Sequence, residues 1–169
     1  MLSRMIGAAL LRSHTYEEIE HDSAATMQAA IVVVIVAVAI GIGSISLGMT
    51  AFILGIVGGI AQWALWAFVT DILGTTLFNT PQTEANWSQL ARTTGFAQTP
   101  GLLRIFGFIP FLGPLLASIG AVWQFVAMVV AVKQALDYTS TWRAVGVVLV
   151  GFILIAILNL IFARLFVFG

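Results

Sequence analysis

Three side chains near the N-terminus have the types and the spacing that could bind a transition metal. His14, Glu18 and His21 stand at positions i, i+4 and i+7, so a continuous helix would place all three on one face. Imidazole and carboxylate groups are common zinc ligands, but a closed site needs a fourth ligand, which the spacing does not supply. The alternative is a mixed polar face on a helix at a membrane surface. We therefore predict no bound metal, with these three residues as the candidates if one binds.

Two short motifs resemble catalytic or nucleotide-binding sequences, and both lack parts that the chemistry requires. "SISLG" at 44–48 lacks the first glycine of a nucleophile elbow, and "GIGSIS" at 41–46 departs from the dinucleotide-binding pattern. Both lie between apolar stretches, where glycine and serine are typical of a turn. The chain also has no cysteine and two histidines. We predict no catalytic residues, no enzymatic activity and no cofactor.

Polar residues inside the apolar stretches are the remaining candidates for chemistry: Gln62, Asp71, Gln124, Lys133 and Asn159. Asp71 and Lys133 lie near the ends of their stretches, where side chains can reach the lipid headgroups. The three amides lie deeper, and uncharged amides at membrane depth usually bond neighbouring helices. Polar groups at this depth can instead line a transport pathway. A small transporter or channel for ions or lipids is therefore the alternative function.

The composition of the chain indicates which elements must position these residues. Of 169 residues, 60% are hydrophobic and 8% are charged, with a mean hydropathy of +1.07. Soluble domains contain about 25% charged residues, so this chain is expected to be an integral membrane protein in contact with lipid. Seven basic and seven acidic residues balance, which leaves no basic surface for nucleic acid. We predict an all-α, polytopic helical bundle.

Four apolar stretches are long enough to cross a bilayer. At about 1.5 Å per residue, roughly 20 helical residues span the hydrocarbon core. We place the full spans, within one transmembrane domain over 24–169, at residues 24–46, 49–78, 115–136 and 144–167. Residues 1–23 are predicted to form an amphipathic segment at the cytoplasmic surface.

The second span carries two kinds of packing signal. Gly55 and Gly59 form a GxxxG face, which allows helices to approach closely in lipid, and packing within the bundle is favoured over homodimerisation. Trp63 and Trp66 precede Asp71, which marks the expected exit from the membrane. We therefore expect both tryptophans to be interface anchors.

The stretch between the second and third full spans is polar first and then apolar but broken. Residues 83–92 could form a surface helix that ends at Gly95. A helix over 100–113 reaches only about 20 Å, too short to cross alone. Pro110 and Pro114 are expected to break it, and Arg104 is expected to reach the headgroups. Because carbonyls freed by proline need cover at membrane depth, we predict a half-span or a fifth span, buried against the bundle.

The number of spans stays open at this point. Basic residues lie mainly on the N-terminal side with either four or five spans, which predicts a cytoplasmic N-terminus in both cases. The charge asymmetry is larger with five spans, whereas the short reach of residues 100–113 favours four.

Long segments of the chain resemble the Yip (Ypt-interacting protein) family of multi-span membrane proteins. The resemblance is carried by "ARTTGFAQTPGLLRIFGFIPFLGP" (91–114) and by "ALDYTSTWRAVGVVLVGF" (135–152) after a long apolar helix. "YEEIEHDSAATMQAA" (16–30) is similar to the start of bacterial members. The resemblance implies a five-span domain with a cytoplasmic N-terminus in a bacterial plasma membrane. The residues that we take from it as candidates for an interaction surface are Arg92, Gly95, Phe96, Pro100, Arg104, Pro110 and Pro114.

The eukaryotic members of this family are associated with vesicle traffic and with binding prenylated Rab-type GTPases. This sequence has no "DLYGP"-like motif and no long soluble N-terminal region, so we do not expect GTPase binding. We expect a membrane-embedded scaffold or accessory subunit that binds other integral membrane proteins of a larger complex, through the segment from Arg92 to Pro114.

Overall fold

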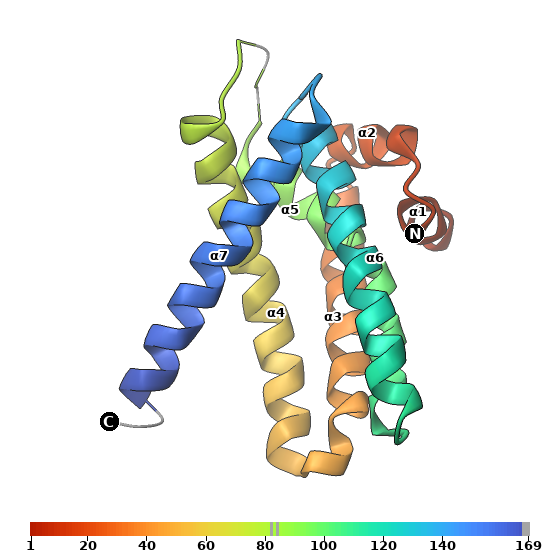
Figure 1. Ribbon diagram of the computed structural model, residues 1–169. Helices are drawn as coiled ribbons and strands as arrows, with labels where there is room; N and C mark the ends of the chain where they lie inside the picture. The colour runs from red at the N-terminus through yellow and green to blue at the C-terminus, as the bar shows by residue number, and fades with distance from the viewer. Residues whose placement is uncertain (82, 84, 167–169) are drawn as a thin grey trace.

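The computed structural model describes residues 1–81, 83 and 85–166, without the side chains of residues 163, 165 and 166. Every regular element in this part of the chain is helical, which confirms the predicted all-α bundle. In chain order (Figure 1), the elements are α1 (Leu2–Ala9), α2 (Ser13–His21), α3 (Ala25–Gly43), η1 (Ile45–Leu47), α4 (Met49–Ile72), η2 (Leu73–Leu77), α5 (Trp87–Phe96), η3 (Thr99–Phe108), α6 (Leu112–Ala135) and α7 (Thr141–Phe166).

Four of the described helices are long and apolar enough to cross a membrane, which confirms the four full spans. They are α3, α4 with its π-helical continuation η2, α6, and α7 as far as Phe162. No charged residue interrupts α3, and after Gln28 its side chains are apolar on all sides, as in a helix without an aqueous face. Helix α4 continues without a gap into η2, past Asp71.

Helices α3 and α4 form an antiparallel hairpin whose turn ends at Gly48. Gly48 has a φ of 102°, a conformation that glycine adopts without steric cost. A methyl group on Gly59 would lie 3.1 Å from the Cβ of Ala37, and one on Gly55 would lie 3.1 Å from the Cα of Gly41. Gly55 and Gly59 therefore face α3 and allow the two helices to approach closely.

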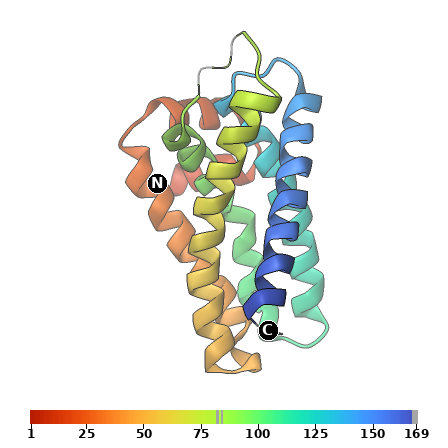
Figure 2. The same cartoon turned by 90° about the vertical axis from the view of Figure 1, so that its left-hand side faces the viewer.

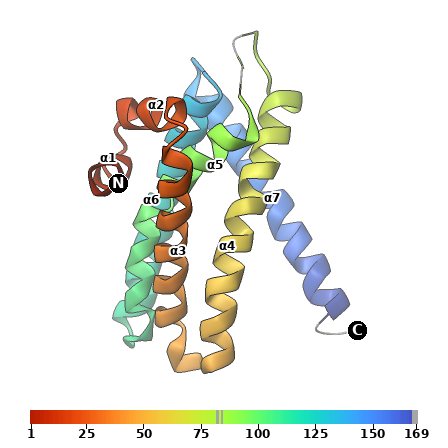
Figure 3. The same ribbon diagram turned by 180° about the vertical axis from the view of Figure 1, so that it is seen from behind.

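Helix α5 and η3 together form a broken fifth pass along the bundle. Gly95 lies beside Ala29, and Gly101 lies beside Val36. Further along, Gly107 lies beside Gly43. The last two contacts follow both segments in the same direction, so η3 runs parallel to α3, whereas α5 crosses the N-terminal part of α3 at an angle (Figure 3). The broken pass thus covers residues 87–108, longer than the predicted 100–113, because part of the polar stretch contributes a buried helix.

The prediction of a surface helix over 83–92 is wrong. The helix begins after Asn86, whose side chain accepts a hydrogen bond from the backbone N–H of Gln89, 3.1 Å away, in a capping box. All residues from Leu90 to Phe96 are buried. The polar sequence can be buried because the hydroxyls of Thr93 and Thr94 donate to the carbonyl of Leu90, at 3.2 and 2.5 Å.

The two prolines expected to break the short span have different roles. Pro110 lies in the turn between η3 and α6, next to the exposed Phe111, whose φ is 63°. Pro114 lies inside the first turn of α6, where a missing N–H leaves no bond unmade. The expectation that Pro114 breaks a helix is therefore wrong, and α6 starts at Leu112 instead of 115.

The short N-terminal helices pack outside the five passes. Helix α2 lies across the end of the bundle where α6 joins α7, whereas the C-terminal part of α7 lies toward the other end (Figures 1 and 2). Helix α1 lies beside α6, and the indole Nε1 of Trp123 donates to the carbonyl of Ala9 at 2.7 Å.

Candidate functional site

The candidate interaction residues of the broken pass divide into a buried group and an outer group. Phe96 has no exposed surface, and Pro100 is buried, with its carbonyl 3.1 Å from where a methyl group on Gly120 would lie. A methyl group on Gly95 would lie 2.9 Å from the Cβ of Ala29. In contrast, Pro110 and Pro114 are exposed. The buried residues hold α5 and η3 against neighbouring helices, so they do not form a free surface in this structure.

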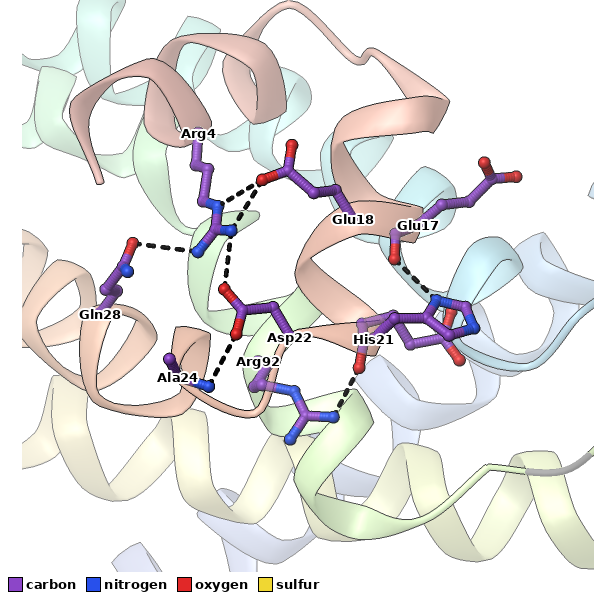
Figure 4. Close-up of polar contacts among 9 residues, drawn as sticks. Arg4, Glu17, Glu18, His21, Asp22, Ala24, Gln28 and Arg92 are labelled. Carbon is purple, nitrogen blue, oxygen red and sulfur yellow. Dashed lines mark hydrogen bonds and ion pairs between the residues drawn. The ribbon is translucent and has the colours of Figure 1, made fainter.

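Arg92 is buried and ties α5 to the corner between α2 and α3. Its Nη2 donates to the main-chain carbonyl of Glu20 at 2.5 Å (Figure 4). Its Nη1 donates to Oγ1 of Thr26 at 3.3 Å. The side-chain amide of Gln89 donates to Oε1 of Glu20 at 3.1 Å. Two side chains from α5 therefore bind one residue near the end of α2.

Glu20 is the buried acid of this corner, with 2% of its surface exposed. Burial and, less strongly, the negative charge of Asp137 raise the pKa of its carboxyl, His21 and Arg92 lower it, and the net result is a pKa of about 7. Glu17 adds a smaller effect in the same direction as Asp137. The corner thus holds a carboxyl group that gains or loses its proton near neutral pH.

A second polar network fastens α1 to α2 and α3. The guanidinium of Arg4 donates to Oε1 of Glu18 from Nε at 3.0 Å and from Nη2 at 2.7 Å. It also pairs with Asp22 at 2.7 Å and donates to the amide oxygen of Gln28 at 3.3 Å (Figure 4). These contacts hold the pKa of the Asp22 carboxyl below its ordinary value.

The three metal-site candidates all lie on α2, but they do not converge on one point. Glu18 is engaged by Arg4, His14 is exposed, and Nδ1 of His21 lies 2.9 Å from the carbonyl of Glu17. Within the described part of the chain, no group of three or more His, Cys, Asp and Glu side chains is arranged to hold a metal.

Two of the predicted intramembrane amides, Gln62 and Gln124, meet in a cavity inside the bundle. This central cavity has a volume of about 210 Å³ and is lined mainly by α3, α4, α6 and η3. Gln98 and Arg104 also line it, and the amides of Gln124 and Gln98 are hydrogen bonded to each other. The remaining wall is apolar and includes Val33, Val36, Ile40, Met128 and the aromatic rings of Trp66, Phe125 and Phe152.

Two expectations about side chains of this cavity are wrong. Arg104 lines the cavity instead of reaching the headgroups, and Trp66 is 4% exposed instead of anchoring at the interface. Trp63 is half-buried and donates to the carbonyl of Ala91 at 3.2 Å. Trp63 thus packs on the broken pass, and Trp66 packs against Gly151 and Phe152 of α7.

The spacing of polar residues in the sequence indicates the polar face of η3, if the segment is taken as a 3₁₀ helix. A 3₁₀ helix has three residues per turn, so side chains at i, i+3 and i+6 share a face. Gln98, Gly101 and Arg104 follow this spacing, and the glycine leaves space between the two polar side chains. A methyl group on Gly101 would lie 3.3 Å from Oε1 of Gln124 and 3.8 Å from Nη1 of Arg104.

The other predicted polar residues lie away from the cavity. Asp71 is half-buried near the end of α4, and its carbonyl accepts a hydrogen bond from the hydroxyl of Thr75 at 2.7 Å. Lys133 donates from Nζ to Oγ1 of Thr141 at 3.1 Å, across the junction of α6 and α7. Asn159 is exposed on α7.

Comparison with known protein families gives a match over nearly the whole of this structure. The model of the Yip1 domain family matches residues 9–161, from the end of α1 into the last turns of α7. The chain belongs to the Yip1 domain family. The match confirms the resemblance found in the sequence and, with the four long apolar helices, identifies a multi-pass membrane protein. Searches of curated proteins and of solved structures gave no match.

Within this Yip1 domain, the matched region contains both the broken pass and the central cavity. The Arg4 network has one of its members outside the matched region, at Arg4 itself, and the others inside it.

Proposed function

We propose that this Yip1-domain protein has no catalytic activity and serves as a membrane-embedded scaffold or accessory subunit that binds partner membrane proteins. The observation that carries the proposal is the divergence of α7 from the bundle (Figures 1 and 3). Its first half packs on α4, with Gly151 beside Trp66 and Leu73. Ile155 is 4% exposed, but every side chain from 156 to 162 is exposed.

The amide of Asn159 supports a protein partner for this half of α7. Asn159 is exposed, and no described residue is hydrogen bonded to its side chain. Lipid chains offer such an amide no hydrogen bond, whereas a neighbouring helix can, with a gain of about 0.6–2 kcal/mol. A partner helix packed along α7 would cover the apolar side chains and satisfy the amide at once.

The proposal includes a cytoplasmic N-terminus in a bacterial plasma membrane. Basic residues at the α2 end of the bundle support this orientation, because cytoplasmic ends of membrane proteins carry more lysine and arginine. Five passes then place the end of α7 on the other side. A reporter fused to the C-terminus should report export, and a cytoplasmic reporter signal would contradict the five-pass orientation.

Site-specific crosslinking tests the partner surface directly. The chain has no native cysteine, so single cysteines can be introduced at Ile157, on the exposed half of α7, and, as a matched exposed control, at Ile31 on α3. The substitution at Ile157 leaves the amide of Asn159 in place. We expect the Ile157→Cys protein to crosslink in membranes to one stoichiometric membrane protein that also co-purifies in mild detergent. Equal crosslinking from both positions, or isolation of a lone monomer, would count against the proposal.

The central cavity favours a second candidate function, the transport of ions or lipids. It places Gln62, Gln124 and Arg104 together in the middle of the bundle, where polar groups commonly line a pathway. Reconstituted protein should then give a flux that falls when Gln62 and Gln124 are replaced by leucine. Asn159→Leu is the control, because Asn159 lies outside the cavity. A flux unchanged by the substitutions of Gln62 and Gln124 would exclude transport through the central cavity.

A further inference from the structure

The central cavity lies at mid-depth in the bundle and is open on one side. Its lining residues come from the middle turns of α3, α4 and α6, which are three of the long apolar helices. Two of them, Ala121 of α6 and Phe152 of α7, are exposed. The cavity therefore opens through the lateral surface of the bundle, beside α6 and α7, and this surface faces lipid in a membrane-spanning protein.

Arg104 brings a positive charge into this cavity without a compensating negative charge. Both ion pairs in the described residues belong to Arg4. No described group accepts a hydrogen bond from the Arg104 guanidinium. A cation at membrane depth is costly unless it pairs with another group, and such residues usually mark a functional site. An anion in the cavity would supply the missing partner.

Three further polar groups can contribute to binding an anion. Nε1 of Trp66 is buried and has no hydrogen-bond partner among the described residues, and an indole nitrogen can only donate. Oε1 of Gln124 is also buried without a partner. Because Gln124 and Gln98 are paired through their amides, a joint rotation of both amides would place an N–H of Gln124 where its oxygen now lies, beside Gly101. Gln62 supplies another amide.

We propose that the central cavity binds a phosphate oxyanion, held by Arg104 and by donors from Trp66 and Gln124, with the phosphate of an anionic lipid as its source. Guanidinium groups bind phosphate oxygens through two parallel hydrogen bonds. The two non-bridging oxygens of a lipid phosphate keep further lone pairs for donors from other directions, and the elements α4, α6 and η3 line the cavity from different sides. The volume of about 210 Å³ has room for a headgroup phosphate but not for a whole lipid.

The lateral opening and the apolar wall favour a lipid over free phosphate. The rings of Trp66 and Phe152 have centroids 4.5 Å apart, and those of Phe125 and Phe152 lie 5.8 Å apart. These rings lie on the cavity wall next to the opening, where a lipid glycerol and acyl chains would pass. Free phosphate would have to cross the same apolar surface without any attached chain.

The inference does not depend on the proposed accessory function, because the two use different residues. Partner binding is assigned to the C-terminal half of α7, and phosphate binding is assigned to Arg104, Trp66 and Gln124. An Arg104 variant should therefore keep its partner, and an Asn159 variant should keep its lipid. Failure of one proposal leaves the other to be judged on its own data.

Binding measurements on the full chain in a non-ionic detergent test the site. Phosphatidylglycerol and phosphatidylcholine are titrated separately by native mass spectrometry, and inorganic phosphate is titrated by calorimetry. We expect one phosphatidylglycerol molecule to bind with an affinity that falls at least tenfold in Arg104→Gln. The matched control is Arg143→Gln, which removes an exposed arginine outside the cavity and should bind as the unmodified chain does.

The other outcomes distinguish the source of the phosphate and the role of the arginine. Arg104-dependent binding of inorganic phosphate, without lipid binding, would support the oxyanion site. It would also show that the bound phosphate is free phosphate and not part of a lipid. If Arg104→Gln does not fold, Arg104→Lys keeps the charge but loses the paired hydrogen bonds, and Gln124→Met keeps the volume but loses the amide. Phosphatidylglycerol and phosphate affinities that are unchanged in all folded variants would overturn the proposal.

Discussion

Helices α3 and α7 are both apolar membrane spans, yet one is enclosed by the bundle and the other is largely exposed. Of the most apolar part of α3, 44% of the residues are buried, compared with 22% for α7. The mean hydropathy has the opposite order, at 2.5 for α3 and 3.0 for α7. Mean hydropathy therefore does not identify the helices that pack most closely: the span of α4 and η2 has the lowest value, 1.9, and only 17% of its most apolar part is buried.

Small residues explain the difference between the two helices. Glycine and alanine let backbones approach, and close packing is the main source of helix association in lipid. Helix α3 presents Ala29, Ala37 and Gly43 to glycines of α4, α5 and η3. The exposed half of α7 carries mostly large aliphatic side chains. Substitutions in the two helices and at the polar contacts around them should therefore differ in their effect on stability.

Gly43→Ala should lower the stability most, because Gly43 makes the closest backbone contact of α3. A methyl group there would collide with the main-chain carbonyl of Arg104, and the backbone of Gly107 lies next to it. We expect a loss of about 3 kcal/mol or more in the free energy of unfolding. Gly58→Ala is the control, because nothing lies within 4 Å of its added methyl group, and its effect should stay within about 1 kcal/mol. Reversible unfolding in mixed micelles measures both, and equal losses would contradict this packing.

Arg92→Ala should have the next largest effect, because it cuts the link between α5 and the α2–α3 corner. The carbonyl of Glu20 would lose its charged donor in a buried place, with an expected loss of about 2–3 kcal/mol. Arg143 is exposed and donates to the carbonyl of Asn79 at 3.3 Å. Its replacement by alanine should cost less than about 0.5 kcal/mol in the same assay. Similar losses for both arginines would show that the burial of Arg92 does not increase its contribution to the free energy of unfolding.

The raised pKa of Glu20, at the same corner between α2 and α3, predicts that the stability of the protein depends on pH. This pKa is raised from 4.5 to about 7, so the folded chain binds the proton more tightly than the unfolded chain. Stability should therefore fall as the pH rises from about 4.5 to 7. Glu20→Gln keeps the oxygen that accepts from Gln89 and should remove most of a Tm decrease of about 2–4 °C between pH 5 and pH 8. Glu17→Gln, at an exposed position of α2, should keep the decrease. A decrease that persists in Glu20→Gln would show that another group titrates.

Asn159→Leu should have the smallest effect on the isolated protein, because it changes an exposed side chain of the diverging helix. The free energy of unfolding should change by less than about 0.5 kcal/mol. The same substitution should reduce co-purification of the partner proposed for α7. Retention of the partner at the unmodified level would place the interaction surface elsewhere.

Much of the architecture follows from the sequence alone. Uninterrupted apolar stretches predict the four long helices, because a bilayer requires helices of this length. Glycines at 55 and 59 predict a close helix contact on α4, but they do not identify α3 as the neighbour. The broken pass could be predicted only in part, since the buried half of it, α5, has the polar composition of a surface segment. Threonine hydroxyls that bond to their own helix make this burial possible, and composition does not reveal it.

Apolar composition and segment length are enough to identify a helical membrane protein, because a bilayer leaves few other folds. The segments 91–114 and 135–152 add the resemblance to the Yip family. The positions at which the polar groups meet depend on the tertiary structure. Gln98 and Arg104 belong to the segment of η3 and Gln124 belongs to α6, and they share one cavity because η3 passes between α3 and α6. The direction of a side chain depends on the helix type and on the neighbours that cover it. For this reason, the arginine expected at the headgroups lies inside the bundle.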